Sequence, residues 1–323
     1  MKSGSRLERL LKAGEFVVCG EMSPPQSADP SQIKKKSEYF RGFTDAVNLT
    51  DNQSAVVRMS SIASAIFLTQ EGLEPIIQMT CRDRNRLAMQ ADLLGAAAFG
   101  IKNVLCLSGD YQSMGNHPHA KSVYDIDSTH LISMVKKMRD DKQFECGDEM
   151  KAEPRMFIGC AANPYASPFE FRVVRLQKKI EAGADFAQTQ AVFDIGIFDE
   201  FMKQVRQREL HKQMGIIVGI LPVRSAKALM FMKENVAGMS IPDYMINRMS
   251  GAEDPKEEGV KMAVELINQL KNIEGVAGIH LMPVMWESII PTVVERAGLL
   301  PRPTPAALED EQPATAEVIP TVD

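Results

Sequence analysis

The chain has 323 residues, of which 45% are hydrophobic and 24% are charged, as is usual for a globular protein. A net charge of −5 and a pI near 5.7 give no reason to expect a nucleic-acid partner. No apolar stretch approaches the roughly 20 residues of a membrane helix, and the charged residues 1–12 lack the apolar core of a signal peptide. We therefore expect a cytoplasmic protein with neither a membrane nor a nucleic acid as partner.

Eight short apolar runs divide the chain, and segments with helical start and stop signals separate them. The runs cover residues 16–20, 46–49, 75–79, 103–107, 156–160, 185–188, 216–220 and 277–282. Continuous apolar runs are typical of strands buried on both faces. Their alternation with helices at a spacing of roughly 30 residues favours a single α/β domain, a (β/α)8 TIM barrel over residues 1–300. In such barrels the chemistry gathers at the carboxyl ends of the strands.

The expected helices begin at residues that cap helix ends. A helix over residues 31–40 follows Asp29-Pro30, and another runs from the capping residue Asp83 to Ala98. A third opens at Ser167-Pro168, ends at Ala182 and is closed by Gly183. Three more helices are expected to start at Asp194, Ser225 and Glu253-Asp254-Pro255.

Three segments interrupt this alternation. Residues 111–128 form a long polar loop after the fourth strand, which suggests a functional loop. Residues 140–154 are charged and are expected to be an exposed insertion. Residues 301–323 are rich in Pro, Ala, Thr and acidic residues, and we expect a disordered acidic tail unless a partner orders it.

Cysteine and histidine spacing indicates no metal site in this chain. The five cysteines stand singly without a Cys-x-x-Cys pair, so neither a zinc ribbon nor an iron–sulfur cluster is expected, and buried reduced thiols are the favoured interpretation. His117-Pro118-His119 offers two ligand types, but no partner for them can be identified in the sequence.

Polar residues at the strand ends carry the functional prediction. Glu21 leaves the first strand into a stiff Pro-Pro turn, where partial burial would raise its pKa and suit a general acid; the alternative is a glutamate that only caps a loop. Asp110 is a second carboxylate on the same rim, and Gly109 before it allows close approach of a ligand. With Gln190 and Thr50, this rim suits a nitrogen-rich heterocycle better than a phosphorylated sugar.

Four segments in order resemble the methylenetetrahydrofolate reductases. They are Glu-Met-Ser-Pro-Pro at 21–25, Leu-Ser-Gly-Asp at 107–110, Glu-Ala-Gly-Ala-Asp-Phe-Ala-Gln-Thr-Gln at 181–190 with Phe-Asp at 193–194, and Gly-Ile-Leu-Pro-Val at 219–223. The resemblance spans residues 7–303. It implies a flavin-bearing (β/α)8 barrel that reduces 5,10-methylenetetrahydrofolate to 5-methyltetrahydrofolate, by reduction of the flavin and then hydride transfer to the folate.

The resemblance also implies roles for single residues. Glu21 matches the general acid that helps to open the imidazolidine ring, and Asp110 matches the aspartate that binds folate and tunes the flavin. Gln190 matches a glutamine that contacts the pterin. The positions implied for flavin binding are Thr50, Gln78, Ser108, Gly109, Asp110, Tyr124, Asp127, Asn163, Arg172, Arg175 and Lys179.

Several positions depart from the family pattern. Gln78 stands where members that use pyridine nucleotides have His, and Asn163 stands where they have Tyr. Arg172 and Arg175 replace an aspartate and an asparagine on the flavin-binding helix; because arginines bind phosphate well, FMN and FAD both remain open.

Two further departures concern the supply of electrons. Ala226 replaces an aromatic residue that packs on the nicotinamide, and Trp286 replaces an arginine. We therefore expect electrons from a separate iron–sulfur or other redox subunit, as in the anaerobe-type reductases, rather than directly from NAD(P)H. The alternative is that other residues stack on the nicotinamide. The alternative functions are a pterin-binding methyltransferase-type barrel without redox chemistry and a structural subunit whose site has decayed.

Overall fold

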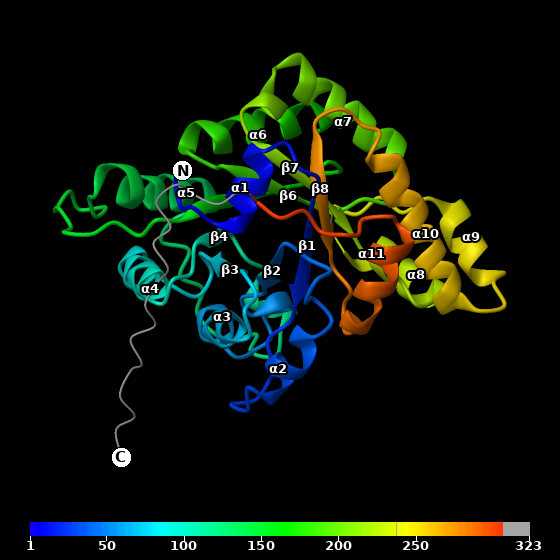
Figure 1. The fold of residues 1–323 in the computed structure, drawn as a ribbon, viewed down its shortest axis with the longest axis horizontal. Coiled ribbons are helices and arrows are strands. Elements are labelled where there is room, and N and C mark those ends of the chain that lie inside the picture. The colour runs from blue at the N-terminus through cyan, green and yellow to red at the C-terminus, as the bar shows by residue number, and fades with distance from the viewer. Residues whose placement is uncertain (237, 306–323) are drawn as a thin grey trace.

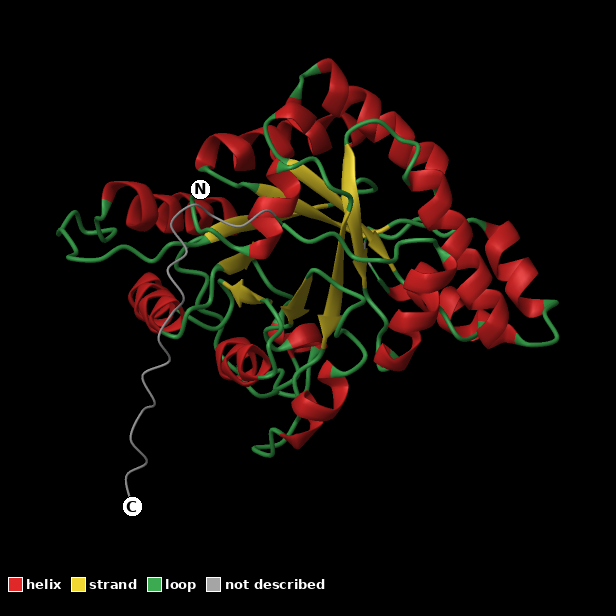
Figure 2. Cartoon of the chain, viewed as in Figure 1, coloured by secondary structure: helices red, strands yellow, loops and turns green. Residues whose placement is uncertain are grey.

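The computed structural model describes residues 1–236 and 238–305 of the chain. Eight parallel strands form a closed barrel in sequence order, as Figures 1 and 2 show, and β1 closes the barrel against β8 with Val17 beside Gly278. The predicted (β/α)8 barrel is confirmed. The strands are β1 (Val17–Met22), β2 (Ala46–Leu49), β3 (Pro75–Thr80), β4 (Asn103–Leu107), β5 (Phe157–Ala162), β6 (Phe186–Ala191), β7 (Gly215–Ile220) and β8 (Val276–Leu281).

The helices cover the outside of the barrel, except α1, which packs against the inner core (Figure 1). They are α1 (Arg6–Lys12), α2 (Ser31–Ser37), α3 (Ser61–Gln70), α4 (Arg86–Ala98), α5 (Ser128–Lys136), α6 (Phe169–Ala182), α7 (Ile195–Gln207), α8 (Ala226–Asn235), α9 (Asp243–Ser250), α10 (Pro255–Leu270) and α11 (Ile290–Arg296). Short helical turns occur at Gln53–Ala55, Gln112–Met114, Lys137–Asp141, Leu210–Lys212 and Glu287–Ile289.

Most predicted helix ends are confirmed, and two are wrong. Asp194, Ser225 and Asp254 accept hydrogen bonds from the first turns of α7, α8 and α10, and Gly183 ends α6 with a φ of 118°. Asn85 caps α4, whereas the predicted cap Asp83 instead pairs with Arg82. The helix after Pro30 ends at Ser37 rather than at Phe40.

The barrel interior changes from apolar to polar along its axis. At the amino ends of the strands, Leu7 and Leu10 of α1 pack with inward-facing strand residues, among which the rings of Phe157 and Phe186 stack 5.2 Å apart. Toward the carboxyl ends, the inward positions of β1, β3, β6 and β8 are polar: Glu21, Gln78, Gln188, Gln190 and His280. The interior therefore offers a polar floor only at the end where the sequence predicts the site.

The last described residues belong to the amino face of the barrel. Arg302 is nearly buried, forms an ion pair with Asp45 at 2.5 Å and donates a hydrogen bond to the carbonyl of Phe16. Pro303 accepts a hydrogen bond from Arg6. The folded part thus extends to at least Pro303, so the predicted disordered tail over residues 301–323 begins too early. Its residues 306–323 lie outside the described residues.

Candidate active site

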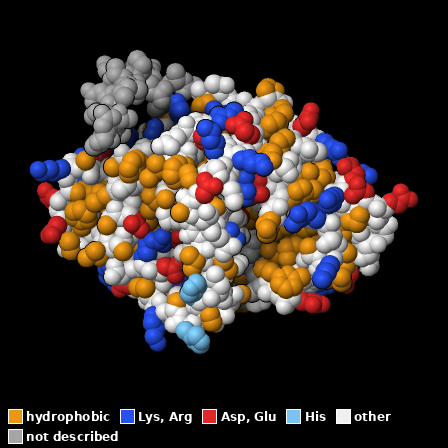
Figure 3. Space-filling model, turned by 90° about the horizontal axis from the view of Figure 1, so that it is seen from below, with side chains coloured by type: hydrophobic (Ala, Val, Ile, Leu, Met, Phe, Trp, Pro, Cys, Tyr) orange, Lys and Arg blue, Asp and Glu red, His pale blue; other side chains and the backbone are white. Residues whose placement is uncertain are grey.

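A cavity of about 540 Å³ opens at the carboxyl ends of the strands, between the barrel and α6. Figure 3 views this face and shows a hollow near its centre, with hydrophobic and basic side chains beside it. Its volume is in the usual range of small-molecule sites. The predicted site residues that line it are Glu21, Gln78, Asn163, Arg172, Arg175, Lys179 and Gln190.

Glu21 lies on the floor of the cavity with its side chain about 10% exposed. The amide nitrogen of Gln78 donates a hydrogen bond of 3.2 Å to its Oε2. Burial raises the pKa of Glu21 to about 7; the negative charge of Glu287 also raises it, while the Gln78 hydrogen bond opposes the shift. The direction predicted from the strand-end position is confirmed, and the carboxyl group can hold a proton near neutral pH.

His280 is a floor residue that the sequence reasoning missed. It comes from β8, where it pairs in register with Cys19 of β1, and its Nε2 lies 3.5 Å from Glu21 Oε2. Burial lowers the pKa of His280 to about 3, so the imidazole is neutral beside the carboxyl group. A signal existed: a lone His at an inward position of an otherwise apolar strand.

The wall of the cavity that α6 provides is basic. Lys179 donates a hydrogen bond of 2.7 Å to the carbonyl of Ala161, which fixes its ammonium group at the carboxyl end of β5. Arg172 donates to the carbonyls of Pro164 and Ala166. Arg175 lines the cavity without an ion pair to any described residue. These positive charges suit a phosphate group at the cavity mouth.

The predicted residues of the loop after β4 do not line this cavity. Asp110 is exposed, and its carboxylate accepts a hydrogen bond of 3.0 Å from the backbone N–H of Ser54; Ser108 is exposed as well. Asp127 caps α5 by accepting from the N–H of His130. Gly109 has a φ of 90°, which favours glycine, and a Cβ there would also crowd Thr80 and Arg82 at 3.1 Å, so the local backbone alone accounts for a glycine here.

Two other predicted residues, Thr50 after β2 and Tyr124 within the loop after β4, do not line the cavity either. Thr50 follows β2, is 1% exposed, and its hydroxyl has no hydrogen-bond partner among the described residues. The Tyr124 hydroxyl donates weakly toward the carbonyls of Gly109 and Asp110, at 3.4 and 3.5 Å, and its ring meets Tyr111 edge-on.

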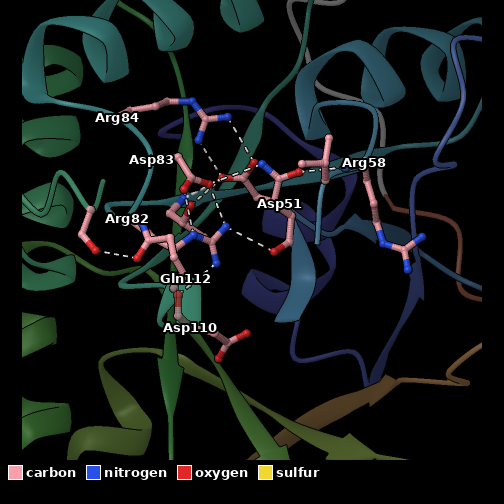
Figure 4. Close-up of polar contacts among 12 residues, drawn as sticks. Asp51, Arg58, Arg82, Asp83, Arg84, Asp110 and Gln112 are labelled. Carbon is pink, nitrogen blue, oxygen red and sulfur yellow. Dashed lines mark hydrogen bonds and ion pairs between the residues drawn. The ribbon is translucent and has the colours of Figure 1, made fainter. Parts of the chain in front are cut away.

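A buried ionic network supports the loops after β2, β3 and β4 (Figure 4). The side chain of Arg82 is 2% exposed; it pairs with Asp83 and donates 3.2 Å hydrogen bonds to the carbonyls of Asn52 and Asp110. Asp51 pairs with Arg84 and accepts from both the N–H and the hydroxyl of Thr80. Arg82 therefore fixes the backbone that carries Asp110.

The two departures that concern the reductant lie after β7 and β8. Ala226 is the first residue of α8, directly after the capping residue Ser225. Trp286 is partly buried against the core, and the guanidinium group of Arg224 lies 5.9 Å from the centre of its ring. An arginine therefore occupies one face of the only tryptophan.

The described residues contain neither a cluster suited to a metal nor a membrane-spanning helix. In residues 1–236 and 238–305, no group of three or more His, Cys, Asp or Glu side chains is arranged so that it could hold a metal ion. Within those ranges no helix is long and apolar enough to cross a membrane. Cys19, Cys81, Cys106 and Cys160 are buried thiols and Cys146 is an exposed one.

The residues present fit a flavin. The buried polar atoms on the floor include Gln188 Nε2 and Oε1 and His280 Nε2, which have no hydrogen-bond partner among the described residues and could meet a ring heterocycle. Leu105, Leu107 and Met282 offer apolar contacts to a flat ring, and Arg175 and Lys179 offer positive charge to a phosphate.

A closed (β/α)8 barrel with a buried glutamic acid and a polar cavity floor at the carboxyl ends of its strands defines the class: a TIM barrel with its candidate site at the usual end. The sequence model of the methylenetetrahydrofolate reductase family matches residues 6–298, and the chain belongs to that family. The prediction that this chain is a member of this enzyme family is thereby confirmed.

The sequence is similar to those of bacterial and eukaryotic proteins. It is 24% identical over 311 residues to a probable methylenetetrahydrofolate reductase (NADPH) of Caenorhabditis elegans, covering 91% of this chain but 44% of that protein. It is 25% identical over 297 residues to the 5,10-methylenetetrahydrofolate reductase of Pectobacterium carotovorum, covering 89% of this chain and 92% of that protein. The chain thus spans less than half of the nematode relative and most of the bacterial one.

Among solved structures, a similar fold occurs in an uncharacterized protein from Clostridium thermocellum that binds two copies of 5-methyl-5,6,7,8-tetrahydrofolic acid. The TM-score is 0.64 at 17% identity, over 91% of this chain and 99% of that one. At this identity the likeness shows the fold alone.

Proposed function

We propose that this chain reduces 5,10-methylenetetrahydrofolate to 5-methyltetrahydrofolate in the cavity at the carboxyl end of the barrel. A bound flavin, FAD or FMN, would supply the hydride that the methylene carbon receives. Membership of the family supports this activity, and so does a cavity that combines a protonated carboxyl group with polar and basic walls.

The observation that carries the proposal is the burial of Glu21 on the cavity floor beside Gln78 and His280, which raises the pKa of its carboxyl group to about 7. A carboxylic acid that keeps its proton near neutral pH can give it to a ring nitrogen as the imidazolidine ring of the folate opens. Gln78 holds Oε2 by a hydrogen bond, and the neutral His280 adds no positive charge that would favour ionisation. Turnover should therefore fall as the pH rises through about 7.

Other residues bind and orient the ligands in this proposal. Gln190 has its Oε1 fixed by the N–H of its neighbour Ala191 at 3.0 Å, which leaves its amide nitrogen for the pterin. Lys179 and Arg175, which line the cavity wall, would hold the phosphate of the flavin. The role of Asp110 toward the ligands stays a prediction, because its carboxylate lies outside the cavity at the N–H of Ser54, on backbone that Arg82 fixes.

Replacement of Glu21 tests the proposed reaction. Glu21→Gln keeps the shape and the Gln78 contact but removes the proton donor, so we expect retained flavin and a fall in folate turnover of about 10²–10⁴-fold. Turnover and bound flavin are measured on the same preparation. Turnover equal to that of the original chain would remove the acid role.

We also propose that electrons arrive from a separate redox subunit. The position proposed to stack on a nicotinamide is the small Ala226, and Trp286 has Arg224 over its ring. Rapid mixing of the flavin-loaded protein with NADH should bleach the flavin slowly or incompletely. Prompt and full bleaching would contradict this proposal without affecting the proposed folate chemistry.

Extraction and identification of the flavin from purified protein decides between FMN and FAD. A yellow protein that oxidises methyltetrahydrofolate with an artificial acceptor supports the reductase. A colourless protein that binds folate would instead favour the methyltransferase-type barrel without redox chemistry.

A further inference from the structure

A second glutamine lies deeper on the floor than Gln190. Gln188 occupies β6 two residues earlier, and both glutamines line the cavity. Gln188 is 3% exposed and lines the cavity together with Glu21 and His280. The resemblance to the family assigns a role to Gln190 and none to Gln188.

The amide of Gln188 has no neighbour among the described residues to satisfy it other than the weakly polar thiol of Cys19. Neither Nε2 nor Oε1 forms a hydrogen bond with good geometry to any described residue. The amide does interact with the thiol of Cys19: burial is the larger effect and raises the pKa of that thiol, while the contact with Gln188 lowers it. A thiol is only a weak hydrogen-bond partner. Because an unsatisfied buried polar atom costs free energy, an amide at this position needs a partner that enters from the cavity.

The geometry of a primary amide specifies the chemistry of that partner. The amide presents one donor and one acceptor side by side, which matches a ring N–H next to a ring carbonyl. Both ligands of the proposed function, a flavin and a pterin, carry such a lactam edge. The apolar side chains of Leu105 and Met282 beside the floor suit the faces of a flat ring.

We propose that Gln188 binds the lactam edge of the heterocycle seated on the cavity floor, through paired hydrogen bonds from its Nε2 and to its Oε1. The proposal rests on the proposed function and adds a recognition residue to the same site. Gln188 then contributes affinity and ring orientation, while Glu21 contributes the proton.

The variant Gln188→Met tests this role, because Met has a similar length without the polar atoms. For the ligand-free protein we expect an unchanged or higher unfolding temperature, since two unsatisfied buried atoms are removed. Affinity for the recognised ring should fall roughly tenfold to a hundredfold. Flavin affinity is measured by fluorescence titration and folate affinity by spectral titration at saturating flavin. A loss of affinity for only one of the two ligands identifies the ring whose lactam edge Gln188 binds.

Ser64→Ala is the matched control. Ser64 is a fully buried residue of α3, outside the cavity, and its hydroxyl also has no partner among the described residues. Its removal should leave both ligand affinities unchanged.

Two results would overturn the proposal. Affinities of Gln188→Met within twofold of the original for both ligands would mean that water alone satisfies the amide. A lower unfolding temperature of ligand-free Gln188→Met and of Gln188→Leu, with matching affinity losses, would assign a structural role. If the unaltered chain binds neither flavin nor methyltetrahydrofolate, the proposed function fails and this proposal fails with it. If the unaltered chain binds these ligands and Gln188→Met binds them equally well, only the proposal for Gln188 fails.

Discussion

The two ends of the barrel each contain a buried carboxyl group, and the two groups differ in how many hydrogen bonds they accept. At the amino end, Glu8 of α1 accepts hydrogen bonds from the N–H groups of Lys2, Ser3 and Gly4 and an ion pair from Lys12. At the carboxyl end, Glu21 has one hydrogen bond, from Gln78, and a neutral histidine beside it. A saturated carboxylate stabilises the fold, whereas an under-bonded carboxyl group holds a proton and is available for chemistry.

The pKa values express this contrast. Although burial alone would raise the pKa of Glu8, the bonds from Lys12 and the backbone lower it to about 2. Burial without such bonds raises the pKa of Glu21 to about 7. Both groups start from 4.5, so their contributions to stability change with pH in opposite directions.

Removing the fully hydrogen-bonded carboxylate of Glu8 at the amino end should give the largest change in the free energy of unfolding. The pKa of Glu8 is lower in the folded chain than in the unfolded one, so its contribution is present above pH 4.5 and is lost as the pH falls through about 2. Glu8→Gln should lower the free energy of unfolding at pH 7 by about 3 kcal/mol, measured by urea denaturation. Turnover per folded molecule should stay the same.

The control for this prediction is Glu15→Gln. Glu15 is exposed just after α1, so its replacement should change the free energy of unfolding by less than about 0.5 kcal/mol. Equal stabilities of the Glu8 and Glu15 variants would mean that the amino end does not depend on its saturated carboxylate.

Glu21→Gln should show the opposite dependence on pH. Between pH 4.5 and about 7 the unfolded chain releases the Glu21 proton while the folded chain keeps it, so the free energy of unfolding falls as the pH rises. The variant lacks this loss and should gain about 2–3 kcal/mol relative to the original chain between pH 4.5 and pH 8. Urea denaturation of both proteins at the two pH values measures the gain. A difference that is independent of pH would show that Glu21 ionises normally.

A third test compares two parts of the carboxyl end of the barrel. The polar side chains of the loops after β2, β3 and β4 form ion pairs and hydrogen bonds with one another, whereas several polar side chains on the cavity floor have no partner among the described residues. Arg82→Lys keeps the charge but loses the fork that reaches both Asn52 and Asp110, and should lower the free energy of unfolding by about 1–2 kcal/mol. We expect weaker folate binding as well, because the backbone at Asp110 is loosened. The control Arg86→Lys alters an exposed pair with Asp125 and should cost less than about 1 kcal/mol. Equal losses in both variants would deny Arg82 its positioning role.

Local signals made much of the fold predictable. The eight strands follow from apolar runs. Asp194 and Ser225 cap the beginnings of α7 and α8 with their side chains, and Gly183 ends α6 because glycine readily adopts a positive φ. The error at α4 has a physical reason: Asp83 and Asn85 are both good caps, and only the tertiary structure shows that Arg82 already engages Asp83.

The site was less predictable because it depends on register and loop geometry. His280 and Gln188 stand inside apolar runs, where a lone polar residue looks the same whether it faces the floor of a cavity or not. Asp110 was expected on the same rim as Glu21, and only the structure shows that the loop turning at Gly109 places its carboxylate at the N–H of Ser54, outside the cavity. The floor positions of His280 and Gln188 and the position of the Asp110 carboxylate can be established only from the three-dimensional structure of the closed barrel, not from the sequence alone.

The smallest expected effect tests whether the environment of Glu21 can be tuned from outside the cavity. Glu287, nearly buried after β8, raises the pKa of Glu21 through its negative charge, and it pairs with Lys36 of α2. Glu287→Gln removes this charge and leaves Lys36 unpaired, and both changes favour the ionised form of Glu21. The alkaline limb of the turnover profile should therefore move down by less than about one pH unit. Lys36→Met is the matched control with the opposite sign, because it leaves the charge of Glu287 uncompensated and should move the limb up. Shifts of the same sign in both variants would show that the limb does not report Glu21.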